Sequence, residues 1–139
     1  MRHILLDSSA LVALADRRDP DHRAVADFVQ TIKGQALLVT TDYVLDETVT
    51  VVKKRYGYQA AVRLGRIIRT SEFCRYLILT AEDEATAWAT FEKYDDKAWS
   101  FTDCACLAVM QRLNISEVLS LDIHFQQMGV QVWPSYPST

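Results

Sequence analysis

Short apolar runs alternate with segments of helical periodicity along the whole chain. Each run has the length and composition of a strand that is buried on both faces. The segments between the runs repeat apolar residues at intervals of three and four, as helices that pack by one face do. Such alternation implies right-handed crossovers, and it predicts an α/β fold with a parallel sheet. The predicted strands occupy residues 4–6, 36–39, 73–79, 118–121 and 130–133.

Residues that cap helices precede most of the predicted helices. Asp19 is followed by proline, which suits the first helical position, and Gly34 ends the helix that follows. A further helix is predicted over residues 57–70, and Asn114 ends the helix that begins near residue 100. The predicted capping residues are Ser8 or Ser9, Asp19, Thr40 or Thr41, Thr80 and Ser100.

Length and composition favour one domain over residues 1–139. The chain has 139 residues and is 50% hydrophobic, which is enough for a sizeable core. No apolar stretch approaches the roughly 20 residues that span a bilayer, and no signal peptide is visible. Cys74, Cys104 and Cys106 have no metal-binding spacing, so we expect buried thiols. Together these features predict a soluble, cytoplasmic protein.

Four acidic residues follow the predicted strands or open the helices beyond them. Asp7 and Asp122 come directly after strands, Glu47 lies beyond the strand at 36–39, and Asp103 lies near the start of a helix. Because parallel strands end at one edge of a sheet, these carboxylates should converge in one crevice. Clustered carboxylates repel one another, and a divalent cation such as Mg²⁺ or Mn²⁺ relieves the repulsion. The pattern predicts a metal-dependent phosphoester hydrolase.

Each acid, taken alone, also has a structural explanation. Asp7 and Asp122 can cap helices or form Asx turns, and Asp103 stands where an acid completes a capping box. Glu47 lies beside a packed apolar stripe, where a carboxylate needs a partner. His124 is explained as a packing or hydrogen-bonding histidine. Four independent caps need not meet at one edge, so the shared location favours a common site.

A locally basic segment contrasts with the net charge of −3. The overall charge argues against broad electrostatic capture of nucleic acid. The basic segment is either a solvated helix face or a contact for RNA phosphates or a partner protein. The candidate contact residues are Lys53, Lys54, Arg55, Arg63, Arg66 and Arg69.

Four motifs, in this order, resemble the signatures of PIN-domain nucleases, and they are most similar to those of VapC-type toxins of toxin–antitoxin systems. The motifs are ILLDSSAL at residues 4–11, YVLDET at 43–48, SFTD at 100–103 and SLDIHF at 120–125. The resemblance covers essentially the whole chain. It implies a three-layer α/β/α PIN-like fold with a central parallel sheet of four to five strands.

The resemblance also implies an activity, a cofactor and a set of site residues. Asp7 and Asp103 would be the central ligands of Mg²⁺ or Mn²⁺, and Glu47 and Asp122 would complete the shell. The implied reaction is hydrolysis of an RNA phosphodiester by activated water. Hydroxyl groups could support the metal shell through water; the candidates are Ser9 and Thr102.

Two partners are implied by the same resemblance. One is a second copy of the chain in a homodimer, and the other is a small antitoxin that covers the site. An acidic site would accept a basic side chain from the antitoxin. This sequence departs from the family pattern at Ser120, where many relatives have threonine, and at Cys104 and Cys106, but it keeps all four acids.

Two other functions remain as alternatives. A phospho-acceptor signalling domain also gathers acids around Mg²⁺, but it needs a lysine beyond a late strand, and no lysine follows Lys97. A noncatalytic PIN scaffold that binds RNA would be recognised by lost acids. Cleavers of tRNA, rRNA and mRNA share the same acids, so the sequence leaves the RNA substrate open.

Overall fold

The computed structural model describes residues 1–70 and 73–135. Its strands are β1 (Arg2–Leu6), β2 (Ala36–Thr41), β3 (Arg75–Leu77), β4 (Glu117–Leu119) and β5 (Gln131–Trp133). Its helices are α1 (Ser8–Ala15), α2 (His22–Ile32), α3 (Asp42–Tyr56), α4 (Tyr58–Arg69), α5 (Ala81–Lys93), α6 (Phe101–Leu113) and α7 (His124–Gln127).

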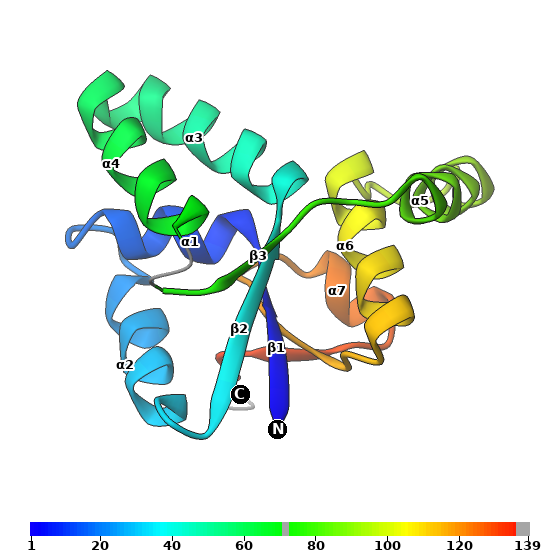
Figure 1. Ribbon diagram of the computed structural model, residues 1–139, viewed down its shortest axis with the longest axis horizontal. Helices are drawn as coiled ribbons and strands as arrows, with labels where there is room; N and C mark the ends of the chain where they lie inside the picture. Colours follow the sequence, from blue (N-terminus) through cyan, green and yellow to red (C-terminus); the bar gives the residue numbers. More distant parts are fainter. Residues whose placement is uncertain (71–72, 136–139) are drawn as a thin grey trace.

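The strands of the described residues form one parallel sheet in the order β3-β2-β1-β4-β5. Figure 1 shows α1 and α2 on one side of the strands and α5, α6 and α7 on the other. Helices α3 and α4 lie beyond the carboxyl ends of β1 and β2, at the top of the view (Figure 1). The predicted three-layer α/β fold is confirmed, and its sheet has five strands.

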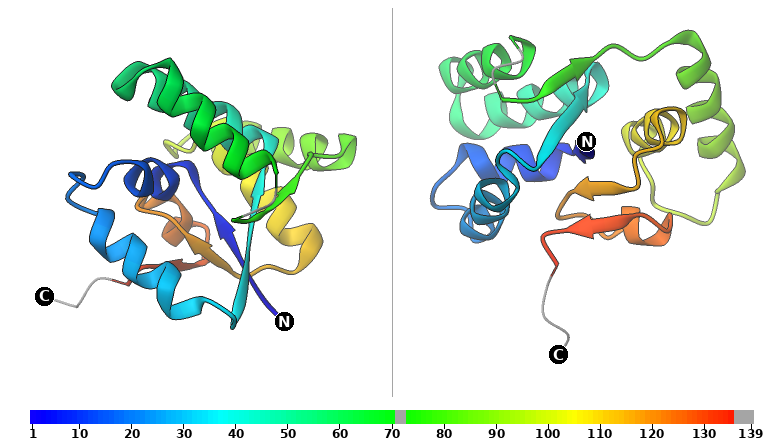
Figure 2. Two further views of the ribbon diagram at one scale, coloured as in Figure 1. Left: turned by 60° about the vertical axis from the view of Figure 1, so that its left-hand side comes forward. Right: turned by 60° about the horizontal axis from the view of Figure 1, so that its bottom comes forward.

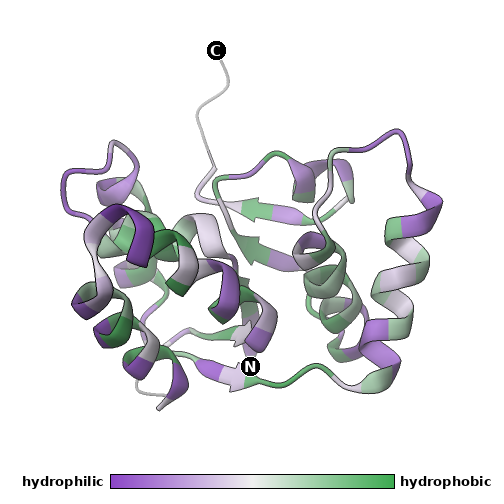
Figure 3. Cartoon of the chain, turned by 90° about the horizontal axis from the view of Figure 1, so that it is seen from above, coloured by the Kyte–Doolittle hydropathy of each residue, from purple (hydrophilic) through white to green (hydrophobic). Residues whose placement is uncertain are grey.

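The core is built around β1, the middle strand of the sheet. Ile4, Leu5 and Leu6 are each 0% exposed, because helices cover both faces of the sheet. Helix α6 is buried along most of its length, as its nearly continuous apolar sequence predicted. Apolar segments line the strands and the inner helix faces, and hydrophilic segments lie mainly on the outer helices (Figure 3). A strand buried on both faces explains the unbroken apolar run before Asp7.

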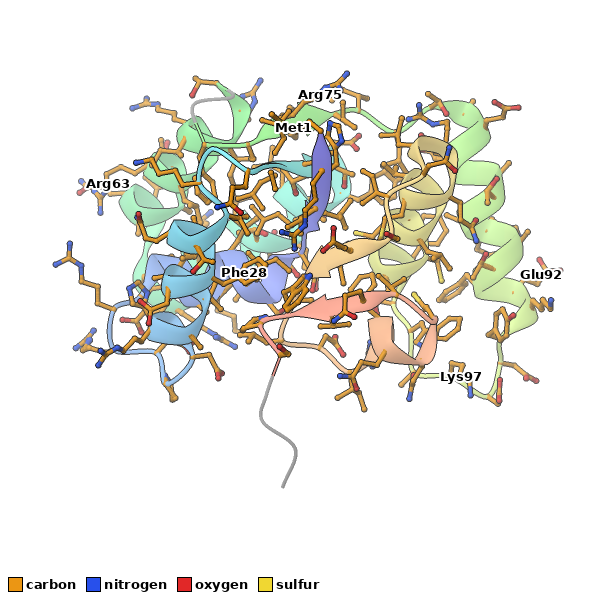
Figure 4. All side chains as sticks on the ribbon, turned by 90° about the horizontal axis from the view of Figure 1, so that it is seen from below. Met1, Phe28, Arg63, Arg75, Glu92 and Lys97 are labelled. Atoms are coloured by element: carbon orange, nitrogen blue, oxygen red, sulfur yellow. The ribbon has the colours of Figure 1, made fainter. Side chains whose placement is uncertain are left out.

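Side-chain contacts tie β5 to α2 and to the starts of β1 and β4. Phe28 of α2 stacks on Trp133 of β5 with a ring-centroid separation of 5.3 Å (Figure 4). The Trp133 Nε1 group donates to Glu117 Oε1 at 2.9 Å. Arg2 Nη2 donates to the same carboxylate oxygen at 2.7 Å. These contacts hold together elements from both ends of the chain.

The third strand is shorter than predicted. Residues 73–79 were expected to form it, whereas β3 covers only Arg75–Leu77. It is an edge strand with β2 as its neighbour, and the Leu79 N–H donates to Asp42 Oδ1 at 3.1 Å rather than continuing the ladder. The other strands agree with the predicted ranges within two residues at each end.

Two predicted helix starts were wrong by one or two residues. Helix α2 begins at His22, because Asp19 forms a turn in which its Oδ1 accepts a hydrogen bond from the Asp21 N–H at 2.8 Å. Helix α1 begins at Ser8, and its N-cap residue is Asp7, whose side chain makes no capping hydrogen bond. The hydroxyls of Ser8 and Ser9 are therefore not caps.

Helix α2 ends at Ile32, two residues before Gly34, and the helix predicted over residues 57–70 covers Tyr58–Arg69. Four other predicted helix boundaries are confirmed. Thr41 caps α3 by accepting a hydrogen bond from the Val44 N–H at 3.2 Å. Asn114 ends α6 in the left-handed conformation, with φ of 55°. Complete capping boxes begin α5 and α6, formed by the pairs Thr80–Asp83 and Ser100–Asp103.

None of the helices within residues 1–70 and 73–135 combines the length and apolar character needed to cross a membrane. Cys74, Cys104 and Cys106 are free and buried, as predicted. Burial raises the pKa of the Cys74 thiol to about 11, so this group stays protonated near neutral pH.

An ion pair between α5 and α6 gives a pH-dependent prediction. Arg112 donates to both carboxylate oxygens of buried Asp83, at 2.7 and 2.9 Å, and lowers the pKa of that carboxyl. Asp83→Asn should lower the free energy of unfolding by roughly 2 kcal/mol at pH 7. Because the folded pKa is depressed, this contribution is fully present above the unfolded pKa of about 3.9, and it is lost as the pH falls from there through the lower folded pKa.

Urea unfolding of the parent and of Asp83→Asn at several pH values measures this difference. Glu92→Gln removes an exposed carboxylate from the same helix and serves as the matched control. A difference between parent and variant that does not become smaller as the pH falls below about 4 would contradict the assignment of the effect to the ion pair.

Candidate active site

The candidate site lies at the point in the sheet where the order of the strands reverses direction. Strand β1 pairs with β2 on one side and with β4 on the other, which makes the β1–β4 junction a topological switch point. Asp7 follows β1, and its N–H donates to the Leu119 carbonyl of β4 at 3.1 Å. The two chain segments that leave these strands therefore start side by side.

A cavity of about 450 Å³ occupies this junction. It brings together all four acids that the sequence singled out: Asp7 after β1, Glu47 on α3, Asp103 on α6 and Asp122 after β4. The prediction that these distant carboxylates converge is confirmed. The cavity is also lined by Ser8, Ser9, Val12, Asp19, Val51, Arg55, Ser100, Leu121 and His124.

Asp7 is held by two hydroxyl groups. Ser9 Oγ and Ser120 Oγ both donate to Asp7 Oδ2, at 3.0 and 2.8 Å. Only 2% of Asp7 is exposed, and burial raises the pKa of its carboxyl, an effect that the charge of Asp103 increases and the serine hydrogen bonds oppose. The serine hydroxyls act on Oδ2, and Asp7 Oδ1 takes part in neither contact.

The serine hydroxyls that hold Asp7 also shape the loop after β4. Ser9 Oγ accepts a hydrogen bond from the Leu121 N–H at 2.9 Å, and Ser120 Oγ accepts one from the Asp122 N–H at 3.0 Å. The same two groups thus fix a carboxylate from one strand and the backbone that carries the next acid. Ser9 was predicted as a supporting residue, whereas Ser120 was noted only as a departure from the family pattern.

Asp103 performs two roles with one carboxylate. It is the third residue of α6, where its Oδ2 accepts a hydrogen bond from the Ser100 N–H at 2.9 Å and completes the capping box. The same oxygen contacts His124 Nδ1 at 2.7 Å. The Asp103 side chain is thereby oriented from two directions, and its Oδ1 takes part in neither contact.

His124 links two of the acids. Its Nδ1 lies 2.7 Å from Asp103 Oδ2 and 3.2 Å from Asp122 Oδ2. Asp122 Oδ1 in turn accepts a hydrogen bond from the His124 N–H at 3.1 Å, which forms the turn that was considered for this aspartate. Asp103, Asp122 and His124 are close enough together to share one metal ion.

Glu47 reaches the cavity from the second turn of α3. Burial raises the pKa of its carboxyl, and the charges of Asp7 and Asp103 raise it further. Hydrogen bonding with the side chains of Ser8 and Thr102 lowers the pKa of Glu47 and so opposes these two effects. Thr102 was predicted to support the metal shell, and in the structure it hydrogen-bonds with the Glu47 carboxyl.

The donor set fits a divalent cation. Within residues 1–70 and 73–135, none of the four acids forms an ion pair with lysine or arginine, although two of them are almost fully buried. Buried carboxylates without a compensating charge are unfavourable. Carboxylate oxygens with hydroxyl groups nearby are the hard ligands that Mg²⁺ and Mn²⁺ prefer.

The structure divides the six candidate basic residues into three groups. Arg55 lines the acidic cavity. Lys53, Arg66 and Arg69 line a separate groove of about 650 Å³ between α3 and α4, which lie alongside each other (Figure 2). Lys54 and Arg63 are exposed and line neither cavity, and Arg63 points outward at the edge of the molecule (Figure 4).

Sequence reasoning missed three residues of the site: Ser120, which hydrogen-bonds to Asp7, and His124 and Asp19, which line the cavity. The signal for the first two was present, because SLDIHF places a hydroxyl and an imidazole two residues either side of Asp122. Asp19 lines the cavity from the turn before α2, and its sequence context with proline indicated only a helix start. The contacts of Ser120 with Asp7 and of His124 with Asp103 depend on β4 lying beside β1.

Comparison with known proteins identifies the family. A family model for the PIN domain matches residues 4–131. This chain belongs to the PIN domain family. This chain is 33% identical over 132 residues to the 23S rRNA-specific endonuclease VapC20 of Mycobacterium tuberculosis. The match covers 94% of this chain and 98% of VapC20. Ribonuclease VapC26 of the same organism is 29% identical over 119 residues, covering 86% of each chain.

Solved structures agree with this assignment. The crystal structure of VapC20, described as a toxin that cleaves the sarcin-ricin loop, matches this PIN chain with a TM-score of 0.81 and 29% identity over 91% of this chain and 95% of that one. VapBC2 of Rickettsia felis, bound to promoter DNA, matches with a TM-score of 0.72 and 11% identity over 94% and 96% of the chains. The second match shows a shared fold alone.

The electrostatics of the site give a stability prediction. In the presence of a chelator, Glu47→Gln should raise the melting temperature at pH 7 by about 3–5 °C, roughly the shift that 1 kcal/mol produces in a domain of this size. The folded state raises the pKa of Glu47, so the parent gains stability as the pH falls through that raised value toward the unfolded pKa of about 4.3. The advantage of the variant should therefore shrink with acidity.

Thermal unfolding between pH 4 and pH 8 measures this effect. Asp46→Asn changes the exposed carboxylate next to Glu47 on α3 and is the matched control, for which little change is expected. A variant Glu47→Gln that melts below the parent at pH 7 would show that the carboxylate stabilises the metal-free fold.

Proposed function

We propose that this chain is an Mg²⁺- or Mn²⁺-dependent endoribonuclease and the toxin of a VapBC-type toxin–antitoxin pair. In this proposal residues 1–139 form a single PIN domain that acts on RNA in the cytoplasm and assembles as a homodimer. The observation that carries the proposal is the cavity at the β1–β4 junction, where four carboxylates meet without a lysine or arginine ion pair among the described residues.

Asp7 and Asp103 would hold the cation, with Glu47 and Asp122 completing the shell. Both central aspartates are almost fully buried, and each has one carboxylate oxygen outside the contacts described above. The bound cation would lower the pKa of water and stabilise negative charge on the phosphodiester. His124 lies within reach of the same ion through its contacts with Asp103 and Asp122.

Hydroxyl and amide groups around the four acids would position the ligands. Ser9 and Ser120 hold Asp7 Oδ2, so the carboxylate cannot rotate freely when the cation changes. The Ser100 capping amide holds Asp103 in the same manner. Such hydrogen bonds to ligating carboxylates orient the ligands and tune metal affinity. A site that is held in place before substrate binds loses less free energy on reaching the reactive geometry.

The relatives support RNA as the substrate. VapC20 is named as a 23S rRNA endonuclease and VapC26 as a ribonuclease. The match to VapC20 spans almost the full length of both proteins, so 23S rRNA is the first substrate to test on this chain. Lys53, Arg66 and Arg69 in the α3–α4 groove remain predicted contacts for RNA or a partner protein.

A small antitoxin is the proposed partner. The match to VapC20, whose crystal structure is described as that of a toxin, supports a toxin role, and the acidic cavity would accept a basic side chain. A phospho-acceptor domain is a weaker candidate, because no lysine follows Lys97. A noncatalytic RNA-binding scaffold is weaker as well, because all four acids are kept and gathered.

Loss of single carboxylates should abolish cleavage. Asp7→Asn and Asp103→Asn keep the shape of the side chain but remove a ligand charge, and each should lower kcat/KM by at least ~100-fold. The assay is cleavage of 23S rRNA and of total RNA with Mg²⁺, with Mn²⁺ and with a chelator. Asp46→Asn is the matched control and should cleave at the parental rate.

Two results would contradict the proposed mechanism. One is cleavage that persists in the chelator, and the other is parental activity in both variants. Mn²⁺ binding followed by electron paramagnetic resonance gives an independent readout, because binding should weaken in Asp7→Asn even when no RNA is present.

The antitoxin proposal has its own test. Mixing the protein with the purified product of the adjacent small gene should give a stable complex and suppress cleavage, because the partner covers the carboxylates. Size-exclusion chromatography with light scattering measures the complex, and a free toxin with twice the 15.8 kDa mass of one chain would indicate the homodimer. Undiminished cleavage at saturating partner concentration would disprove the inhibition.

A further inference from the structure

Helix α3 presents two different stripes to two different cavities. Glu47, Val51 and Arg55 line the acidic cavity, at intervals of four residues. Leu45, Val49 and Lys53, at the same intervals, line the α3–α4 groove. Residues four apart lie on one helix face, so the first stripe runs from a carboxylate at the centre of the site to a guanidinium at its margin.

Arg55 is held at the cavity without pairing with its carboxylates. Among residues 1–70 and 73–135, no acid forms an ion pair with Arg55. Its side chain instead interacts with the hydroxyl of Tyr56, which donates to Asp16 Oδ2 at 2.9 Å. The guanidinium is thus a cation at the margin of the cavity that forms no ion pair with the carboxylates of the cavity.

The spacing along α3 separates Arg55 from the reacting centre. Arg55 follows Glu47 by eight residues, which corresponds to about 12 Å along a helix axis. This separation of the two backbone positions favours a contact with a phosphate other than the one that the Glu47 carboxylate would approach. The guanidinium is well placed for another phosphate of the same strand, and planar guanidinium groups bind phosphate oxygens with two parallel hydrogen bonds.

We propose that Arg55 binds a phosphate that flanks the scissile one, and that it guides the RNA strand into the acidic cavity along the Glu47–Val51–Arg55 stripe. The inference rests on the proposed ribonuclease function and adds a substrate-positioning residue to it. A strand that carries negative charge must approach a negatively charged cavity, and one cation at the margin lowers this repulsion. Val51 between the two charged groups offers an apolar surface.

The remaining basic residues do not share this position. Lys54 and Arg63 line neither cavity, and Lys53 faces the groove on the other side of α3. Within residues 1–70 and 73–135, Arg55 is the only lysine or arginine that lines the acidic cavity. Of the basic side chains, Arg55 should therefore make the main contribution to RNA binding at the cavity.

The test compares three substitutions in steady-state cleavage. Arg55→Gln should raise KM for RNA about tenfold and leave kcat near the parental value, because a flanking contact acts on binding. Arg55→Lys keeps the charge but not the paired hydrogen bonds, and it should recover part of the loss. Arg23→Gln removes an exposed arginine from α2 and is the matched control. Melting temperatures of all variants establish that each is folded.

A binding measurement separates this inference from the proposed function. RNA affinity is measured in the Asp7→Asn background, with and without Arg55→Gln, over a range of salt concentrations. Loss of one phosphate contact should reduce the slope of log affinity against log salt by about 0.7–0.9. This readout decides the role of Arg55 even if the parent does not cleave RNA, a result that would disprove the proposed function instead.

Three results would overturn the inference. The first is an unchanged KM and an unchanged salt slope in Arg55→Gln. The second is a fall in kcat at constant KM, which would place Arg55 at the reacting phosphate. The third is loss of antitoxin binding with parental RNA affinity, which would make Arg55 a contact for a partner protein.

Discussion

Repulsion among buried carboxylates is the constraint on which the rest of the site depends. Asp7 and Asp103 are 2% and 5% exposed, and Glu47 approaches them from α3. Burial and mutual charge raise the pKa of Asp7 and of Glu47 above their ordinary values. A fold that holds these groups together gives up stability at neutral pH, and a divalent cation would restore it.

The fold limits this cost by giving the site groups structural roles as well. Asp103 completes the capping box of α6, and Ser120 joins the Asp7 carboxylate to the backbone of Asp122. These hydrogen bonds favour the charged carboxylates and oppose the effect of burial. The residues that position the acids therefore also hold the ends of β1, β4 and α6 in place.

Charge is distributed unevenly around the cavity, although the net charge of the chain is only −3. The four acids lie at the switch point of the sheet, Arg55 of α3 lies at the margin of their cavity, and Lys53, Arg66 and Arg69 line the groove on the other side of α3. An acidic centre suits a cation, and a basic margin suits a polyanion that must approach it. Helix α3 carries both kinds of charge, which makes its orientation over the sheet decisive for the site.

The sequence by itself determined the local features of this protein. Unbroken apolar runs fixed the strands, and capping boxes at Thr80 and Ser100 fixed two helix starts, because these signals depend on neighbouring residues. It also supplied the four acids and the order of their motifs. It overestimated β3, because Asp42 captures the Leu79 N–H from a distant part of the chain.

The tertiary structure alone decided which strand lies next to β1, and that choice created the site. The contact between Ser120 and Asp7 joins residues that are 113 positions apart, and no local pattern encodes it. The pairing of β1 with β4 likewise brought His124 to Asp103, and the packing of α3 turned Arg55 toward the cavity. Contacts of this kind arise from the burial of whole faces, which only the folded chain specifies.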